Sequence, residues 1–363
     1  MDGSRRVGVV LGPRTYQIHI EAGRLNHAGH VLAPWIDEQV VFVVSDRQVG
    51  QLYLGRFIKH SLATAARVET FVVPAGETSK SVAMAETIWN EMVDRRLTRE
   101  SVVIALGGGV VGDLAGFAAA TFMRGIDFIQ VPTTLMAQVD SSIGGKVGVN
   151  LAQAKNMVGS FWQPRLVLID PQVLTTLDSR EYRSGLAEVV KYGVILDPFL
   201  FNYIQEHATH LLELDAAVLE YVIERCCQLK AAVVADDERE TSGGRSVLNY
   251  GHTFGHALEA AFGYGTYLHG EAVAIGMTCA MRLAVQMGFV PRELLVRQTA
   301  LLEQFNLPVA CPLELIDDLI VAMKRDKKST RQSMRLVLPT RLGHVELVDW
   351  PGDDAVRSAW RGD

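Results

Sequence analysis

Five short runs of β-branched and other apolar residues in the first half of the chain most strongly constrain its fold. They are residues 40–44 (VVFVV), 70–73, 102–106 (VVIAL), 128–131 and 166–169. Unbroken apolar runs of this length are typical of parallel strands that are buried on both faces. Segments between them, such as residues 81–96, carry apolar residues at helical spacing. The alternation predicts βαβ units and therefore an α/β domain.

The pattern changes near residue 176, where long helical periodicities replace the strand runs. Asp178 with Glu181 three residues later resembles a capping box and predicts a helix start. Strand signals return at residues 334–338 and 345–348, which could pair as a hairpin. The chain of 363 residues is long enough for two domains. We therefore predict an α/β domain over 1–176 and a mainly helical domain over 177–363.

Charge and composition exclude several classes of protein. With 35 Lys and Arg against 41 Asp and Glu, the net charge of −6 disfavours a nucleic-acid partner. The sequence has neither a run of about 20 apolar residues nor a recognisable signal peptide, so we expect a cytoplasmic protein outside membranes. The cysteines form no CxxC pair, which predicts reduced core thiols rather than a zinc knuckle or disulfides. They are Cys226, Cys227, Cys279 and Cys311.

A glycine-rich turn at residues 107–113 (GGGVVGD) follows one predicted strand and precedes a predicted helix. Glycines in this context let backbone N–H groups approach a pyrophosphate at a helix N-terminus, although they could also serve only a tight turn. The acidic residue that usually ends the next strand is missing, because Asp127 precedes that strand. Asp46, Glu77 and Lys80 are therefore the candidates for holding a nucleoside.

Three histidines near residue 260 form a candidate metal site. His252 and His256 share one helix face at i and i+4, His269 follows, and Glu188 lies upstream. Two imidazoles and a carboxylate make the three-ligand set of a catalytic zinc with one open position. Core packing is the alternative, but the surrounding glycine and polar residues favour ligands. Spacing alone leaves open which two histidines bind the metal.

Cations beside turn glycines suggest a substrate that carries phosphate and carboxylate groups. For any single one of them, ordinary surface exposure is the simpler interpretation. The segment from Asp140 to Lys146 joins a carboxylate, two hydroxyls and a cation in an expected loop. The cations are Arg124, Lys146, Lys155, Lys191, Lys230, Arg245 and the run 324–328.

Over residues 40–350 the chain resembles the 3-dehydroquinate synthase family, whose members cyclise a seven-carbon sugar-acid phosphate in the shikimate pathway. The resemblance rests on ordered segments that include PAGETSK, ALGGGVVGDLAGFAAATFMRG, QVPTTLMAQVDSSIGGKVGVN, RSGLAEVVKYG, LNYGHTFGHALE and LHGEAVAIGM. It implies a Rossmann-like NAD-binding domain followed by a helical metal-binding domain. It also implies a homodimer, a catalytic zinc with cobalt as an alternative, and an NAD that is reduced and reoxidised in each turnover.

The resemblance also implies roles for individual residues. The metal ligands would be Glu188, His252 and His269, with His256 left as a polar or acid/base group. Lys146, Asn156 and Lys327 match the phosphate site, and Arg124 matches an arginine from the partner subunit. Lys230, Arg245 and Asn249 match positions that hold the substrate carboxylate and hydroxyls, while Asp140 and Lys191 line the site. The NAD positions are Asp46, Glu77, Lys80, Gly108, Gly109, Asp113, Thr133, Thr134, Lys155 and Thr176.

Some positions depart from the family pattern. Leu151 stands where many members have His, Ala154 stands where many have Gly, and the stretch 241–244 is one residue longer than in close relatives. Three alternative functions share parts of the pattern: another sugar phosphate cyclase, a metal-dependent polyol dehydrogenase and a non-catalytic NAD sensor. A dehydrogenase would not need the cations Lys146, Lys230, Arg245 and Lys327. A sensor would tolerate a defective metal triad, whereas here the triad is intact.

Overall fold

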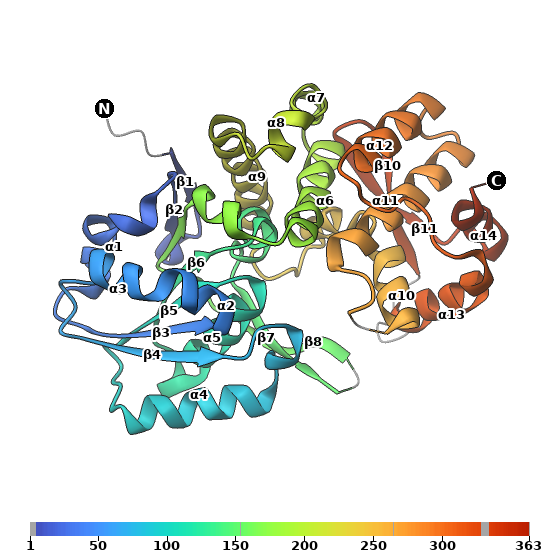
Figure 1. Cartoon of the computed structure of the whole chain (residues 1–363). Helices are drawn as coiled ribbons and strands as arrows, with labels where there is room; N and C mark the ends of the chain where they lie inside the picture. Colours follow the sequence, from blue (N-terminus) through green and yellow to red (C-terminus); the bar gives the residue numbers. More distant parts are fainter. Residues whose placement is uncertain (1–4, 153, 264, 328–333, 363) are drawn as a thin grey trace. The chain divides into compact units, whose positions relative to one another are not determined.

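The computed structural model describes residues 5–152, 154–263, 265–327 and 334–362. The chain forms two compact units (Figure 1). Unit 1 comprises residues 1–177 and 219–239, and unit 2 comprises 178–218 and 240–363. The predicted division at 176/177 assigned everything after it to one domain. Residues 219–239 instead pack with the first unit, because a helical periodicity does not indicate which core the helix joins.

Unit 1 is built on a sheet in the order β1-β2-β9-β6-β5-β3-β4. β1 and β2 are antiparallel, and the other neighbours are parallel. The five predicted strand runs all lie in the parallel part, which confirms the α/β prediction. The strand bounds are β1 Arg5–Val9, β2 Tyr16–Ile20, β3 Val40–Asp46, β4 Arg67–Val73, β5 Val102–Gly107, β6 Asp127–Pro132 and β9 Leu166–Ile169.

Helices cover both faces of this sheet, which explains why the strand runs are continuously apolar. In β3, Phe42 and Val44 join a core with α4 and α5, whereas Val41 and Val43 join a core with α1 and α3 (Figure 1). These helices are α1 Gly29–Ile36, α3 Gly55–Ser61, α4 Val82–Asp94 and α5 Gly109–Thr121; unit 1 also contains α2 Arg47–Val49 and most of α9 Ala216–Asp236.

Two further parts of unit 1 were not predicted. β7 Lys146–Leu151 and β8 Ala154–Phe161 pair as an antiparallel hairpin. Residues Ala137–Ser141, which contain Asp140, form a π-helical turn. The expected loop from Asp140 to Lys146 is therefore wrong at both ends, because Asp140 is helical and Lys146 begins β7.

Unit 2 is mainly helical, as predicted. Asp178 caps α6 by accepting hydrogen bonds from the N–H groups of Arg180 and Glu181. The central helix is α11, which packs against α6, α10, α12, α14 and β10. The elements are α6 Ser179–Ile195, α7 Pro198–Glu206, α8 Ala208–Leu212, α10 His252–Phe262, α11 His269–Gln286, α12 Arg292–Gln304, α13 Ile316–Lys327, α14 Asp353–Arg361 and the predicted hairpin of β10 Arg335–Arg341 with β11 His344–Asp349.

The remaining predictions about the fold concern cysteines and membranes. All four cysteines are buried and none forms a disulfide, which confirms that they are core thiols. Within the described ranges, no helix has the length and apolarity needed to cross a bilayer.

Candidate functional site

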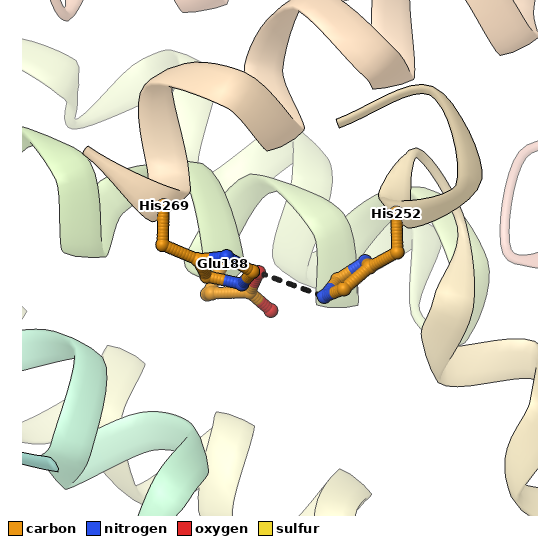
Figure 2. Close-up of side chains that lie close together, drawn as sticks. All are labelled: Glu188, His252 and His269. Atoms are coloured by element: carbon orange, nitrogen blue, oxygen red, sulfur yellow. Dashed lines mark ion pairs between the residues drawn. The ribbon is translucent and has the colours of Figure 1, made fainter. Parts of the chain in front are cut away.

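In unit 2, three helices bring Glu188, His252 and His269 together (Figure 2). Glu188 lies in the middle of α6, His252 is the first residue of α10, and His269 is the first residue of α11. Their ligand atoms all lie within 4.8 Å of one another. The side chains point toward a common centre, as the predicted metal site requires.

The geometry of this group centres on Oε1 of Glu188. This oxygen lies 3.7 Å from Nε2 of His252 and 3.9 Å from Nε2 of His269. Glu188 is completely buried, and neither of its oxygens accepts a hydrogen bond of normal geometry from the described residues. A buried carboxylate is costly unless cations share it, and Lys191 pairs with Oε2 while Oε1 faces the two imidazole nitrogens. The group therefore fits a divalent metal of the kind that carboxylate and imidazole ligands prefer, such as zinc.

Two glycines allow the helices to approach this closely. A Cβ added at Gly270 would overlap the backbone carbonyl of Ser184, whose hydroxyl accepts a hydrogen bond from the Gly270 N–H at 3.0 Å. This contact joins α11 to α6 beside Glu188. A Cβ at Gly276 would overlap the backbone carbonyl of Gly251, so α11 also lies directly against the start of α10. The spacing of Glu188, His252 and His269 therefore depends on glycine at both positions.

Burial and neighbouring charges shift the pKa values of His252 and His269. Lys191, one turn after Glu188 on α6, makes an ion pair with Oε2 of that carboxylate. Burial, and then the Lys191 charge, hold the pKa of His252 well below its ordinary value, so this imidazole is neutral. Burial also lowers the pKa of His269, but its contacts with Glu259 and Glu188 outweigh burial and leave that pKa raised.

The other residues of unit 2 that were predicted for the site lie on α10, on a short helix before it and on α13. His256 is exposed on α10, and its ring centroid lies 5.5 Å from that of His252. Arg245 and Asn249 belong to a short 3₁₀ helix, Gly244–Asn249. Arg245 is only 3% exposed, and its Nε lies 3.4 Å from Oε1 of Glu240. The side chain of Lys327 lies outside the described residues.

In unit 1, the predicted nucleotide residues gather where the strand order reverses. β3 pairs with β4 on one side and with β5 on the other, so connections leave the β3–β5 pair in opposite directions. Nucleotides bind at the carboxyl ends of strands at such a switch point. Asp46 ends β3, and Gly107 ends β5. Asp46 also caps α2, accepting hydrogen bonds from the N–H groups of Gln48 and Val49.

At the glycine-rich turn, the absence of side chains lets hydroxyl-bearing residues approach the start of α5. Gly108 is the N-cap of α5, and a Cβ there would overlap the methyl group of Thr134. A Cβ at Gly109 would overlap the Ser141 hydroxyl. The buried hydroxyls of Thr133 and Ser141 have no hydrogen-bond partner among the described residues. Free helix N–H groups beside unpartnered hydroxyls fit a dinucleotide such as NAD.

A second polar group of unit 1 combines residues that were predicted for different ligands. Lys80 donates hydrogen bonds of 2.5 Å to both Asp113 and Asn156. Asn150 donates to Glu77 at 2.7 Å and accepts from the Asn156 N–H at 2.9 Å. Burial raises the pKa of Asp113, and the Lys80 charge opposes this shift without cancelling it. The hairpin is thereby joined to the predicted NAD residues.

The other residues of unit 1 that were predicted for the site are spread over several elements. Lys230, from α9, pairs with Asp140 at 2.7 Å. The Thr176 hydroxyl lies 2.5 Å from the Tyr53 hydroxyl. Lys146 and Lys155 lie on the β7–β8 hairpin. Arg124 is exposed in a turn at φ 70°, directly before Gly125 at φ 117°.

Sequence reasoning missed Glu259. This carboxylate is buried on α10, with Oε2 lying 3.6 Å from Nδ1 of His269. The signal was present, because His252, His256 and Glu259 stand at i, i+4 and i+7 on one helix face. Helical spacing did not identify Glu259 as a site residue, because the ring that it contacts, His269, belongs to the next helix.

The chain matches family models and known proteins along most of its length. Residues 70–184 match the model of the 3-dehydroquinate synthase N-terminal domain, and residues 185–329 match that of the C-terminal domain. A 3-dehydroquinate synthase of Rhodopirellula baltica is 49% identical over 357 residues, covering 96% of this chain and 95% of the relative. One of Desulforamulus reducens is 48% identical, covering 94% and 95%.

A solved structure also matches closely. The 2-epi-5-epi-valiolone synthase ValA of Streptomyces hygroscopicus, with NAD⁺ and Zn²⁺ bound, superposes with a TM-score of 0.88 at 28% identity. The match covers 96% of each chain.

Proposed function

The chain belongs to the 3-dehydroquinate synthase family, and from this premise we propose how its residues carry out the reaction. The reaction converts 3-deoxy-D-arabino-heptulosonate 7-phosphate to 3-dehydroquinate and phosphate, which makes the protein a carbon–oxygen lyase. The observation that carries the proposal is the convergence of Glu188, His252 and His269 on one point, in a chain that also has a glycine-rich nucleotide turn. A protein that only sensed NAD would not need this triad.

Glu188, His252 and His269 would hold the zinc, or cobalt in its place. A metal held by these residues would supply Lewis-acid chemistry, which would ease oxidation of a substrate hydroxyl. Lys191, which pairs with Glu188, would place its ammonium group where negative charge develops on the substrate oxygen. His256, exposed next to the group, is proposed as a polar or acid/base residue.

The α5 N-terminus, with Gly108 and Gly109, would hold the NAD pyrophosphate. NAD held there would supply a reversible hydride acceptor, so no net NAD would be consumed. Asp46 would accept hydrogen bonds from the ribose, since it ends β3 beside the glycine turn. The remaining residues proposed for NAD are Glu77, Lys80, Asp113, Thr133, Thr134, Lys155 and Thr176.

The cations would orient the two anionic ends of the substrate. For the phosphate we propose Lys146, Asn156, Lys327 and the partner subunit's Arg124. For the carboxylate and hydroxyls we propose Lys230, Arg245 and Asn249, with Asp140 holding Lys230 in place. Elimination, ring opening and aldol closure then require orientation more than strong bases.

These cations also decide between the proposed reaction and its alternatives. A metal-dependent polyol dehydrogenase acts on neutral alcohols and would not need buried Lys230 and Arg245, each at most 5% exposed. Other sugar phosphate cyclases share the phosphate and metal residues, but a substrate without a carboxylate would not use the positive charge of those two residues. We further propose that the enzyme is a cytoplasmic homodimer of the shikimate pathway, which leads to aromatic amino acids.

The experiment supplies the purified protein with the seven-carbon acid phosphate and a trace of NAD. Released phosphate should greatly exceed the NAD supplied, a carbocyclic product should form, and NADH absorbance should not accumulate. NADH formed in proportion to product would instead identify a dehydrogenase. A carbocycle formed only from a substrate lacking the carboxylate would identify another cyclase.

A further inference from the structure

We propose that Glu259 is a positioning residue, which holds His269 in the tautomer whose Nε2 is free to bind the metal. The inference rests on the metal site proposed above, and it concerns a residue to which that proposal gives no role. Glu259 lies on α10, and its side chain is 8% exposed. A carboxylate buried to this degree requires a partner.

The position of the His269 ring identifies that partner. Nδ1 of His269 lies 3.6 Å from Oε2 of Glu259, and Nε2 lies 3.9 Å from Oε1 of Glu188. A neutral imidazole carries one proton, whereas an ionised carboxylate can only accept a hydrogen bond. With Glu259 facing Nδ1, the proton resides on Nδ1. The lone pair of Nε2 then faces Glu188, where the metal ligands converge.

His252 follows the same rule with a different acceptor. Its Nδ1 lies 3.1 Å from the backbone carbonyl of Tyr250, and its Nε2 lies 3.7 Å from Oε1 of Glu188. A carbonyl also only accepts, so this ring too is held as the Nδ1–H tautomer. Metal-binding histidines generally donate their other N–H to a carbonyl or carboxylate, which fixes the ring and raises its basicity. Glu259 differs from the carbonyl in adding a negative charge.

A second interpretation of Glu259 is that it binds a metal itself. His256, Glu259 and His269 also offer ligand atoms within 4.8 Å of one another. If this position and the first were both filled, His269 would have to lose both ring protons and bridge the two ions. A single metal beside Nε2, shared with Glu188 and His252, leaves the Nδ1 proton in place for Glu259 to accept. That arrangement does not require His269 to lose its second ring proton. The geometry therefore favours a positioning role.

The test measures zinc affinity of metal-free protein by competition with a chelator of known affinity. Glu259→Leu removes the acceptor and should weaken zinc binding by roughly 10- to 100-fold. Glu259→Gln keeps an acceptor oxygen for Nδ1–H and should lose less. Glu271→Gln is the matched control, because Glu271 lies near His269 on α11 but pairs with Arg180 and the Leu268 N–H; Gln keeps an acceptor for that N–H, so affinity should stay unchanged.

A second readout is independent of any substitution. Nitrogen-15 spectra of the metal-free wild type, recorded at alkaline pH where the ring is neutral, should show His269 protonated at Nδ1, and Glu259→Leu should shift the ring toward the other tautomer. A neutral wild-type His269 ring protonated at Nε2 would overturn the proposal, as would unchanged zinc affinity in a folded Glu259→Leu protein. A second wild-type zinc that disappears in Glu259→Leu would make Glu259 a ligand. Full zinc binding by His269→Ala would instead refute the metal site itself.

Discussion

Lys230 donates hydrogen bonds of 2.7 Å to both the carboxylate and the backbone carbonyl of Asp140, a residue 90 positions earlier. The pair joins α9 to the π-helical turn after β6 within unit 1. Lys230 is only 5% exposed. Its ammonium group is thus held at a defined point before any substrate arrives, and preorganised charge of this kind costs no reorganisation during binding.

Replacing Lys230 by Met should lower kcat/KM by at least about 100-fold, because a charge-assisted contact with the substrate carboxylate is lost. Lys230→Arg should not restore activity, since the wider guanidinium does not fit a buried ammonium site. Steady-state kinetics with the phosphorylated acid measure both variants. Near-normal kcat/KM in Lys230→Met would remove this residue from the substrate site.

Chelation should abolish activity, and zinc or cobalt should restore it, because the proposed site holds its metal through three side chains and leaves one position open. His269→Ala should then lack zinc in a protein that still folds, since the site is not the core of unit 2. His256→Ala is the matched control and should retain its zinc. Metal analysis and circular dichroism give the two readouts. Full zinc content in His269→Ala would contradict the ligand assignment.

Gly270→Ala should weaken zinc binding and lower stability by about 1–3 kcal/mol, because the new methyl group forces α11 away from the Ser184 carbonyl on α6. Gly55→Ala is the control. Gly55 also lies in a helix, but no heavy atom stands within 4 Å of an added Cβ, so alanine should stabilise by roughly 0.5 kcal/mol. Denaturant unfolding and zinc titration measure the effects. Equal behaviour of the two variants would exclude the close-contact argument.

Arg124 should complete the phosphate site of the partner subunit. Arg124→Ala and His269→Ala should each be inactive alone, whereas a mixed dimer has one site with every residue intact. With random exchange in a twofold dimer, activity should return to about a quarter of the wild-type value. Mixing the two variants under conditions of verified subunit exchange measures this recovery. A mixture that stays inactive would place Arg124 outside the partner's site.

Glu238 should make stability depend on acid pH. Arg14 donates to both of its oxygens, at 2.9 and 2.6 Å, and these hydrogen bonds lower the pKa of Glu238. A lowered acid pKa stabilises the fold above the unfolded-state value of about 4.3, and this stabilisation is lost as the pH falls through the lower, folded-state value. Glu238→Gln should therefore unfold more easily than wild type at neutral pH.

The difference between Glu238→Gln and wild type should vanish in acid, where the carboxyl of the wild type is protonated in both states. Denaturant unfolding across this pH range provides the measurement. Arg14→Met and the double variant complete a thermodynamic cycle that isolates the pair. A coupling free energy that stays constant from neutral to acid pH would show that the ion pair is not responsible.

The strands and the first turn of α5 could be predicted from sequence because their signals are local. Residues 40–44 and 102–106 are apolar at every position, and this pattern by itself requires cover on both faces of a sheet. Gly107 to Gly109 directly follow such a run, so the glycine turn that we propose for the NAD pyrophosphate needed no tertiary information. Asp178 likewise predicted the start of α6, because the cap that it forms involves only its near neighbours.

Only the tertiary structure decided how distant segments meet. The periodicity of residues 219–239 predicts a helix, but the Lys230–Asp140 pair shows which core it joins. Spacing left the choice among three histidines open, whereas helix contacts through Gly270 and Gly276 turn Nε2 of His252 and His269 toward Glu188. Glu259 on α10 contacts His269 on α11 for the same reason, because the two helices pack closely together. The physical reason is that a residue's neighbours along the chain determine its backbone preference, while the distance between two helices depends on which side chains, or missing side chains, lie between them.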